Sequence, residues 1–240
     1  MVLVLYMMEI SPPCRAVLMT IRQLGIQVEL KEENLVIGNS KRHPEFLKIN
    51  PRSCVPTIDD DGFYLWESRA IMTYLVNKYA PNNSLYPKDP KKRAMVDMML
   101  NFDQGTLYRS QVEYLYPAIF RGENPDFTKE VSYQNSLVIL DRSLERNAYV
   151  AGKNLTLADL SIVASISLAE VYDYNFRPYP NIVEWIRRLK NELPYYREVN
   201  EIPLLQFKFW YRPFTDSEEE EMEQNLQSNL RQFAVNSTKL

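Results

Sequence analysis

SCVPT, residues 53–57, and ESRAI, residues 67–71, are the two stretches of this sequence that decide its fold. The first places Pro56 at the start of a predicted strand over residues 55–59. Proline there fixes the backbone and leaves neighbouring N–H and C=O groups free to pair with another molecule. The second puts an acid, a hydroxyl and a cation at a predicted helix start, where unpaired N–H groups hold carboxylates well. Together they predict a receptor for a short peptide with a free amino-acid end.

The first eighty residues alternate between strand and helix patterns. We predict a strand over 3–7, a helix over 14–24 opened by two prolines and closed by Gly25, a strand over 27–31, a helix over 45–49, a hairpin of strands 55–59 and 62–66 turning at Asp60 and Asp61, and an amphipathic helix over 67–80. This order indicates an α/β domain over residues 1–80, a small mixed sheet covered by helices.

Strand patterns end after residue 80. Residues 81–90, rich in Pro, Asn and Lys, predict a linker. Helical patterns follow over 91–116, 128–146, 156–172, 181–191 and 203–211, so we predict an all-helical domain over residues 91–215. Within it, TLAD at residues 156–159 is a capping-box variant before a buried helix. The acidic residues 216–240 predict a tail, helical or disordered.

Composition limits the class of protein. The chain has 240 residues, a net charge of −3 and 45% hydrophobic residues, as soluble globular proteins do. No run of Lys and Arg exceeds three residues, which argues against nucleic acid as a partner, and no apolar run reaches the roughly 18–20 residues of a membrane span. Two cysteines, Cys14 and Cys54, suit a reducing cytosol, and the single histidine, His43, excludes a His-rich metal site and is expected in a surface loop. We therefore expect a cytoplasmic protein without a metal or a membrane partner.

Ser11 stands where the first predicted strand ends and the first helix begins. A hydroxyl at this position can donate a hydrogen bond to an anion. A thiol with a pKa of ~8.5 is only about 3% ionised at pH 7, and lowering its pKa by ~2 units needs about 2.7 kcal/mol. One hydroxyl donor, at about 1.5–3 kcal/mol, and part of a helix dipole can supply this free energy. The alternative is that Ser11 only caps the helix.

Six motifs occur in a fixed order: SPPCR at 11–15, NPRSCVPT at 50–57, LWESRAI at 65–71, YPKDP at 86–90, FDQGTLY at 102–108 and LTLADLS at 155–161. This set resembles the cytosolic glutathione S-transferases, most of all the insect delta/epsilon type with a catalytic serine. The resemblance implies a thioredoxin-like N-terminal domain and an all-α C-terminal domain. It also implies glutathione as co-substrate, a detoxification role and a homodimer.

The resemblance also assigns roles to residues. Ser11 would hydrogen-bond the glutathione sulfur, and Val55 would pair its backbone with the tripeptide before a cis Pro56. Asp103 would complete the charge network and reach the partner subunit's site. The implied glutathione-binding set is Lys41, Arg52, Ser53, Val55, Pro56, Glu67, Ser68, Arg69 and Asp103. The implied hydrophobic substrate set, for which ordinary helix packing is the alternative, is Tyr108, Tyr114, Tyr116, Phe120, Phe207, Phe209 and Trp210.

The sequence departs from the family pattern at three positions. The delta type usually has histidine where Ser53 stands and often another at Lys41, and both hold the glycine end of glutathione. Ser53 donates only one hydrogen bond, so we expect weaker binding there unless Lys41 or Arg52 compensates. The family's interface aromatic is Asn101 here.

Three functions remain open from the sequence. The first is conjugation of the glutathione thiolate to hydrophobic electrophiles. The second is non-catalytic carriage of hydrophobic ligands on the same fold. The third makes Cys14 a thioltransferase nucleophile, although its predicted place inside a helix indicates burial.

Overall fold

The computed structural model describes residues 2–33, 44–124 and 126–211. Two compact units divide the chain, Met1–Lys208 and Phe209–Leu240. The first unit contains the sheet, most of the helices and every cavity discussed below. Lys41, His43 and the predicted tail over residues 216–240 lie outside the described residues.

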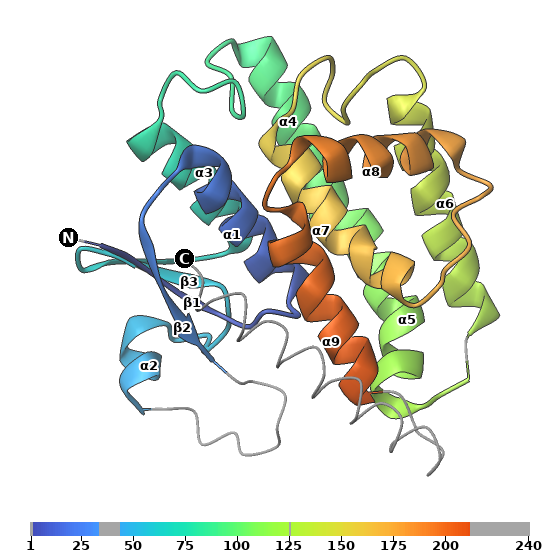
Figure 1. Ribbon diagram of the computed structural model, residues 1–240, viewed down its shortest axis with the longest axis horizontal. Coiled ribbons are helices and arrows are strands. Elements are labelled where there is room, and N and C mark those ends of the chain that lie inside the picture. Colours follow the sequence, from blue (N-terminus) through green and yellow to red (C-terminus); the bar gives the residue numbers. More distant parts are fainter. Residues whose placement is uncertain (1, 34–43, 125, 212–240) are drawn as a thin grey trace, which may run out of the picture. The chain divides into compact units, whose positions relative to one another are not determined.

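The sheet contains β1 (Leu3–Met7), β2 (Val28–Glu32), β3 (Thr57–Asp60) and β4 (Phe63–Trp66) in the spatial order β2-β1-β3-β4. β1 runs parallel to β2 and antiparallel to β3, and β4 is antiparallel to β3. A parallel pair needs a crossover connection, which α1 (Pro12–Leu24) supplies. The predicted mixed sheet is confirmed (Figure 1).

The hairpin between β3 and β4 turns one residue later than predicted. Asp60 still pairs with Phe63, so the turn residues are Asp61 and Gly62. Their φ angles are +60° and +82°. A two-residue hairpin turn of this kind needs positive φ at both positions, which Asp-Gly adopts readily.

The rest of the described chain consists of helices joined by turns and loops, and the predicted strand-free second half is confirmed. They are α2 (Pro44–Ile49), α3 (Ser68–Tyr79), α4 (Pro90–Phe102), α5 (Tyr108–Arg121), α6 (Phe127–Leu144), α7 (Leu157–Val171), α8 (Pro180–Glu192) and α9 (Ile202–Tyr211). In the ranges that the structure describes, none of them is long and apolar enough to cross a membrane. The domain boundaries near residues 80, 90 and 215 stay a prediction.

The helix predicted over 91–116 is two helices joined by a wide turn. The π-helical turn Asp103–Leu107 connects α4 to α5, and the N–H of Tyr108 donates to the carbonyl of Asp103. A π turn closes its hydrogen bond over five residues instead of four, and such turns occur frequently at functional sites. The helical period of the sequence does not reveal it. A second π turn, Arg197–Glu201, precedes α9.

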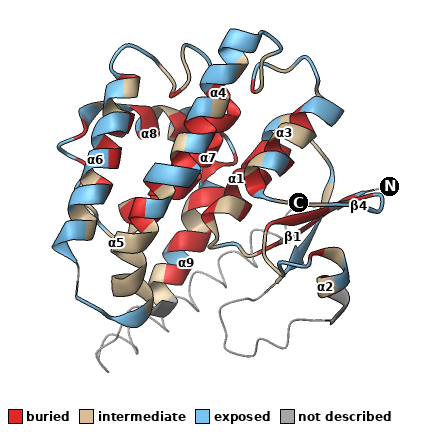
Figure 2. Ribbon diagram, turned by 180° about the vertical axis from the view of Figure 1, so that it is seen from behind, coloured by how far each residue is buried: buried red, intermediate tan, exposed pale blue. Residues whose placement is uncertain are grey.

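The core is built around α7, whose residues are almost all buried (Figure 2). The predicted capping box at its start is confirmed. Asp159 accepts hydrogen bonds from the N–H of Thr156 at 2.8 Å and from its hydroxyl at 2.9 Å. α1 packs against both α7 and α3, so the first helix joins the sheet to the helical part.

Candidate active site

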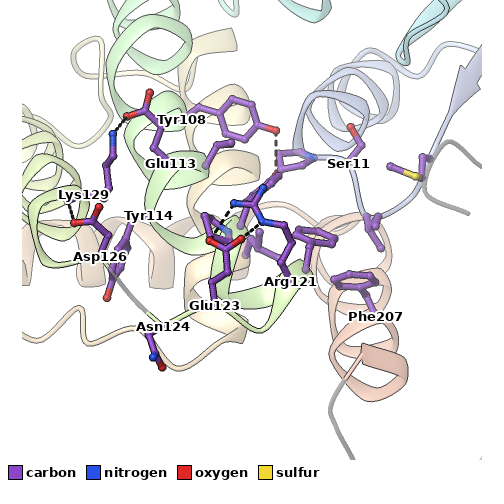
Figure 3. Close-up of a pocket in the computed structure, with 18 residues that line it drawn as sticks. Ser11, Tyr108, Glu113, Tyr114, Arg121, Glu123, Asn124, Asp126, Lys129 and Phe207 are labelled. Carbon is purple, nitrogen blue, oxygen red and sulfur yellow. Dashed lines mark hydrogen bonds and ion pairs between the residues drawn. The ribbon is translucent and has the colours of Figure 1, made fainter. Parts of the chain in front are cut away.

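A cavity of about 840 Å³ opens between the start of α1, helix α5 and Phe207 of α9 (Figure 3). Its apolar lining includes Ile10, Val112 and Leu168. Two ion pairs, Glu113–Lys129 and Arg121–Glu123, also line it. Five of the predicted substrate residues line this cavity: Tyr108, Tyr114, Tyr116, Phe120 and Phe207.

The aromatic wall of this cavity is continuous. The hydroxyls of Tyr108 and Tyr116 are 3.1 Å apart and hydrogen-bonded. The Tyr116 and Phe120 rings lie 5.0 Å apart, and Phe120 lies 5.4 Å from Phe207. Burial raises the pKa of both Tyr108 and Tyr116. Both hydroxyls are neutral at pH 7, and because one donates its proton to the other, one O–H remains free to donate into the cavity.

Ser11 lines the same cavity at the first turn of α1. Its side chain makes no capping hydrogen bond to the helix, and the next two residues are prolines without N–H groups. Ser11 therefore occupies the N-cap position without the usual side-chain capping bond, and its hydroxyl pairs with the Cys14 thiol. Cys14, one turn on, is completely buried, and burial raises the pKa of its thiol to about 11. A neutral, enclosed thiol is a poor nucleophile, which argues against the thioltransferase alternative.

A smaller cavity, of about 480 Å³, adjoins the first. Val55, Pro56 and Ser68 line it, whereas Tyr108, Val112 and Glu113 line both cavities. The expected cis bond between Val55 and Pro56 is present. Other described lining residues are Pro13, Arg52, Cys54, Glu67, Arg69, Gln104 and Arg109. The two stretches that decide the fold therefore meet at one cavity wall.

The backbone at the edge of this smaller cavity is strained. Glu67, the N-cap of α3, has φ +72°, and Ser53 has φ +49°. Such conformations cost about 1–3 kcal/mol in residues other than glycine and cluster at binding sites. Ser53 itself is not among the described residues that line either cavity.

The Arg69 side chain is positioned by an ion pair with a buried carboxylate. It forms an ion pair with Asp103, which is completely buried and also accepts a hydrogen bond from Ser161 at 2.6 Å. Arg69 in turn donates to the Ser68 hydroxyl at 3.2 Å. The Asp103 carboxylate is enclosed by residues of its own chain, and its expected role toward a partner subunit's site stays a prediction.

Arg52 and Glu67 pair with each other across the mouth of the smaller cavity. Their side-chain atoms lie 2.5 Å apart, and both residues are exposed. An exposed ion pair contributes only about 0–1 kcal/mol. A ligand carrying both an ammonium and a carboxylate group can therefore exchange with this pair at small cost.

Two sequence models of one family match most of the chain. The glutathione S-transferase N-terminal domain matches residues 5–83, and the glutathione S-transferase C-terminal domain matches residues 114–192. The chain belongs to the glutathione S-transferase family. The first match includes residues of both cavities, such as Ser11 and Ser68, and the second includes Tyr116 and Phe120 of the larger cavity.

Individual relatives agree with this assignment. Glutathione S-transferase D7 of Anopheles gambiae is 40% identical over 200 residues, covering 82% of this chain and 91% of the relative. A delta-class glutathione transferase of Nilaparvata lugens is 47% identical, with a TM-score of 0.82 over 87% of this chain and 98% of that structure. A Bombyx mori glutathione transferase is 42% identical, with a TM-score of 0.82 over 86% and 96%. The predicted two-domain fold and the enzyme interpretation are confirmed, and a carrier without catalysis is not supported.

Some predicted residues of this glutathione S-transferase have no described place at the cavities. Lys41 lies outside the described residues. Phe209 and Trp210 belong to the second compact unit, so their place in the substrate cavity stays a prediction. The described residues hold no cluster of side chains suited to a metal ion.

Sequence reasoning missed the role of Arg15 in this glutathione S-transferase. The side chain is completely buried and donates to the Ser167 hydroxyl at 3.0 Å and to the Ala164 carbonyl at 2.9 Å. It also donates to the Asn200 side chain at 2.5 Å. Burial lowers the pKa of Arg15 to about 10. The signal was available, because Arg15 lies three residues before Leu18 on the apolar face of α1, where a charge needs buried partners.

Proposed function

We propose that this glutathione S-transferase uses Ser11 to stabilise the glutathione thiolate for attack on hydrophobic electrophiles. One observation carries the proposal. Ser11 lies at the positive end of α1, free of a capping bond, beside the junction of a polar and an aromatic cavity. A hydroxyl there can donate to a sulfur anion, and the helix dipole favours the same charge.

Glutathione fits the smaller cavity in our proposal. The backbone of Val55 would pair with the tripeptide in the manner of an added strand. Ser68 and Glu67 would hold the γ-glutamyl end at the start of α3, where helix N–H groups favour a carboxylate. Arg69, fixed by Asp103, would keep Ser68 oriented. Lys41, Arg52 and Ser53 remain our candidates for the glycine end.

The electrophile would lie in the larger, aromatic cavity. The thiolate sulfur forms a bond to the electrophilic carbon, and the leaving group departs with its electron pair or the charge moves onto the acceptor. The thiol proton goes to solvent. In our proposal the Tyr108 hydroxyl donates to the charge that develops there, while the Tyr116 hydroxyl donates to Tyr108. The apolar wall favours hydrophobic substrates, which agrees with a detoxification role.

We also propose a cytoplasmic homodimer. Large apolar side chains are exposed on β4 and α4, at Phe63, Tyr64, Met95 and Met98. Exposed apolar surface of this kind is typical of an association site. Both cysteines are free thiols, which suits a reducing compartment. Sedimentation analysis would give twice the chain mass of 28.3 kDa if the proposal holds, and the chain mass itself would contradict it.

Ser11→Ala tests the proposed chemistry. We expect the variant to bind immobilised glutathione, to lose about 10- to 100-fold in conjugation rate, and to raise the pKa of the bound thiol by about 1–2 units. Ultraviolet titration of the binary complex measures that pKa. Ser132→Ala, an exposed serine on α6, is the matched control. An unchanged thiol pKa in Ser11→Ala would contradict the role of Ser11.

A further inference from the structure

A third cavity, which we call the tyrosine cleft, lies among α5, α6 and the loop that connects α7 to α8. Its volume is about 410 Å³, and it shares one residue, Tyr114, with the larger cavity of the active site. The residues that give it its chemistry are Tyr114, Tyr172, Tyr174, Tyr179, Glu130 and Asp173. Nothing in the proposed conjugation chemistry uses the other five.

The rings of the tyrosine cleft are held in place by a buried aromatic cluster. Tyr174 packs edge-on against Tyr133 with centroids 5.2 Å apart, and against Phe176 at 5.3 Å. Tyr133 is completely buried, and its hydroxyl donates to Gln111 at 3.1 Å. Tyr114 meets Tyr174 edge-on at 6.2 Å. Tyr114 and Tyr174 are both half-buried, so each is fixed on one side and open on the other.

The charge of the cleft is negative. Glu130 and Asp173 both line it, and the described part of the lining includes no lysine or arginine. Lys208 neutralises Asp173 at 2.6 Å. Glu130 is different, because the hydrogen bond that it accepts at 3.2 Å comes from the neutral amide of Gln134.

The negative charge of Glu130 affects the tyrosine hydroxyls of the cleft. Burial, and after it the charge of Glu130, raises the pKa of the Tyr114 hydroxyl. The same carboxylate acts in this direction on Tyr174 and Tyr179. Its neighbour Lys129 is engaged elsewhere, at 3.4 Å from Glu113. The cleft therefore combines several aromatic rings with one carboxylate, that of Glu130, which forms no ion pair within the described part of the chain.

We propose that the tyrosine cleft binds small organic cations that carry an alkylated ammonium group. Aromatic faces attract cations, and several rings around one site are the usual means of recognising quaternary ammonium ligands. An alkylated ammonium also has apolar surface to bury against the rings, whereas a bare ammonium loses more hydration. Glu130 supplies the opposite charge.

Because Tyr114 borders both cavities, a bound cation touches a wall of the substrate site. We expect it to change the KM for a hydrophobic electrophile while the KM for glutathione stays constant. The binding site itself does not depend on the proposed function, so a binding measurement tests it separately.

The test titrates the full chain with choline and with 3,3-dimethylbutan-1-ol, its neutral isostere, by calorimetry or ligand-observed NMR. We expect choline to bind about tenfold more tightly than the alcohol. Glu130→Gln keeps the side-chain shape and should weaken choline binding about fivefold, and Tyr174→Leu should weaken it at least as much.

The first control variant is Glu145→Gln, which changes an exposed acid at the C-terminal end of α6, outside the cleft. The second is Tyr149→Leu, whose hydroxyl donates to Glu192 at 2.6 Å outside the cleft. Both should leave choline affinity unchanged. Equal affinity for choline and the alcohol would overturn the proposal, as would failure of choline to bind or wild-type affinity in Glu130→Gln. The Glu130 variant keeps the test decisive even if Tyr174→Leu does not fold.

Discussion

Two carboxylates are completely buried beside the first turns of α7, and they are stabilised in different ways. Asp103 pairs with a cation, Arg69, and accepts one hydroxyl, that of Ser161. Asp159 accepts only neutral donors, among them the N–H of Val150 at 2.9 Å and the Trp185 indole at 3.0 Å. Asp103 thus connects α7 to Arg69, which lines the smaller cavity. Asp159 instead connects the start of α7 to the loop at Val150 and to Trp185 of α8. The first arrangement should affect binding and the second should affect stability.

Asp159→Ala should give the largest effect. The change leaves several buried donors without an acceptor, so we expect the free energy of unfolding to fall by about 3–4 kcal/mol. The KM for glutathione should stay constant in the molecules that remain folded. Urea unfolding followed by circular dichroism measures the loss.

Asp89→Ala is the matched control, because Asp89 caps α4 at the surface by accepting from the Lys92 N–H at 2.9 Å. It should cost about 1 kcal/mol. Equal losses in the two variants would mean that burial of the Asp159 network does not matter.

Asp103→Asn should give a mixed effect. It leaves the Arg69 guanidinium, whose side chain is only 15% exposed, without its counter-charge. We expect a loss of about 2–3 kcal/mol in stability and a roughly tenfold increase in the KM for glutathione. Steady-state kinetics with glutathione as the varied substrate tests this. A stability loss with wild-type KM would show that Asp103, like Asp159, affects only stability, and would contradict a role of Asp103 in glutathione binding.

The pH dependence of stability should separate Asp159 from other acids. Burial raises the pKa of Asp159 to about 6, above the value of about 4 in an unfolded chain. The stabilisation that this group contributes is therefore full below the unfolded pKa and is lost as pH rises through about 6. Between about pH 4.5 and pH 7, the stability difference between wild type and Asp159→Asn should change by about 2 kcal/mol. A difference that does not vary with pH would show that Asp159 titrates normally.

Tyr116→Phe should give the smallest effect. It removes one hydroxyl hydrogen bond to Tyr108 and keeps the ring that packs against Phe120. We expect stability to fall by about 1 kcal/mol or less and kcat for a hydrophobic electrophile to fall about two- to fivefold. Tyr149→Phe, which removes a hydroxyl distant from both active-site cavities, is the control. A larger fall in kcat would make the Tyr116 hydroxyl a direct donor to the substrate.

Local chemistry explains what could be predicted from the sequence. The capping box of Thr156 and Asp159 and the junction at Ser11 each depend on residues a few positions apart, whereas the cis bond at Pro56 was expected from the family resemblance. Their geometry follows from turns, caps and helix ends, which the local sequence determines. The small mixed sheet followed in the same way from the alternation of strand and helix patterns, whereas the spatial order of its strands was not predicted.

The parts that could not be predicted depend on distant partners or on a single residue of register. The buried Arg15 is explained by distant acceptors, among them Ser167 and Asn200, which are more than 150 positions away. The enclosure of Asp103 needs Ser161 from another helix. The hairpin turn moved by one residue because strand pairing extends to Asp60, and sequence patterns do not fix a boundary to that accuracy.

The wide turn at Asp103–Leu107 gives the enzyme an angular offset between two nearly continuous helices. Each residue of an α-helix rotates the chain by about 100°. The extra residue of the π turn therefore rotates all of α5 relative to α4. Without it, Asp103 could keep its place against α7, but Tyr108, Val112 and Tyr116 would point to a different side of the helix. The orientation of one whole cavity wall is thus determined by a local change in helical phase that ends directly before Tyr108, the first side chain of that wall.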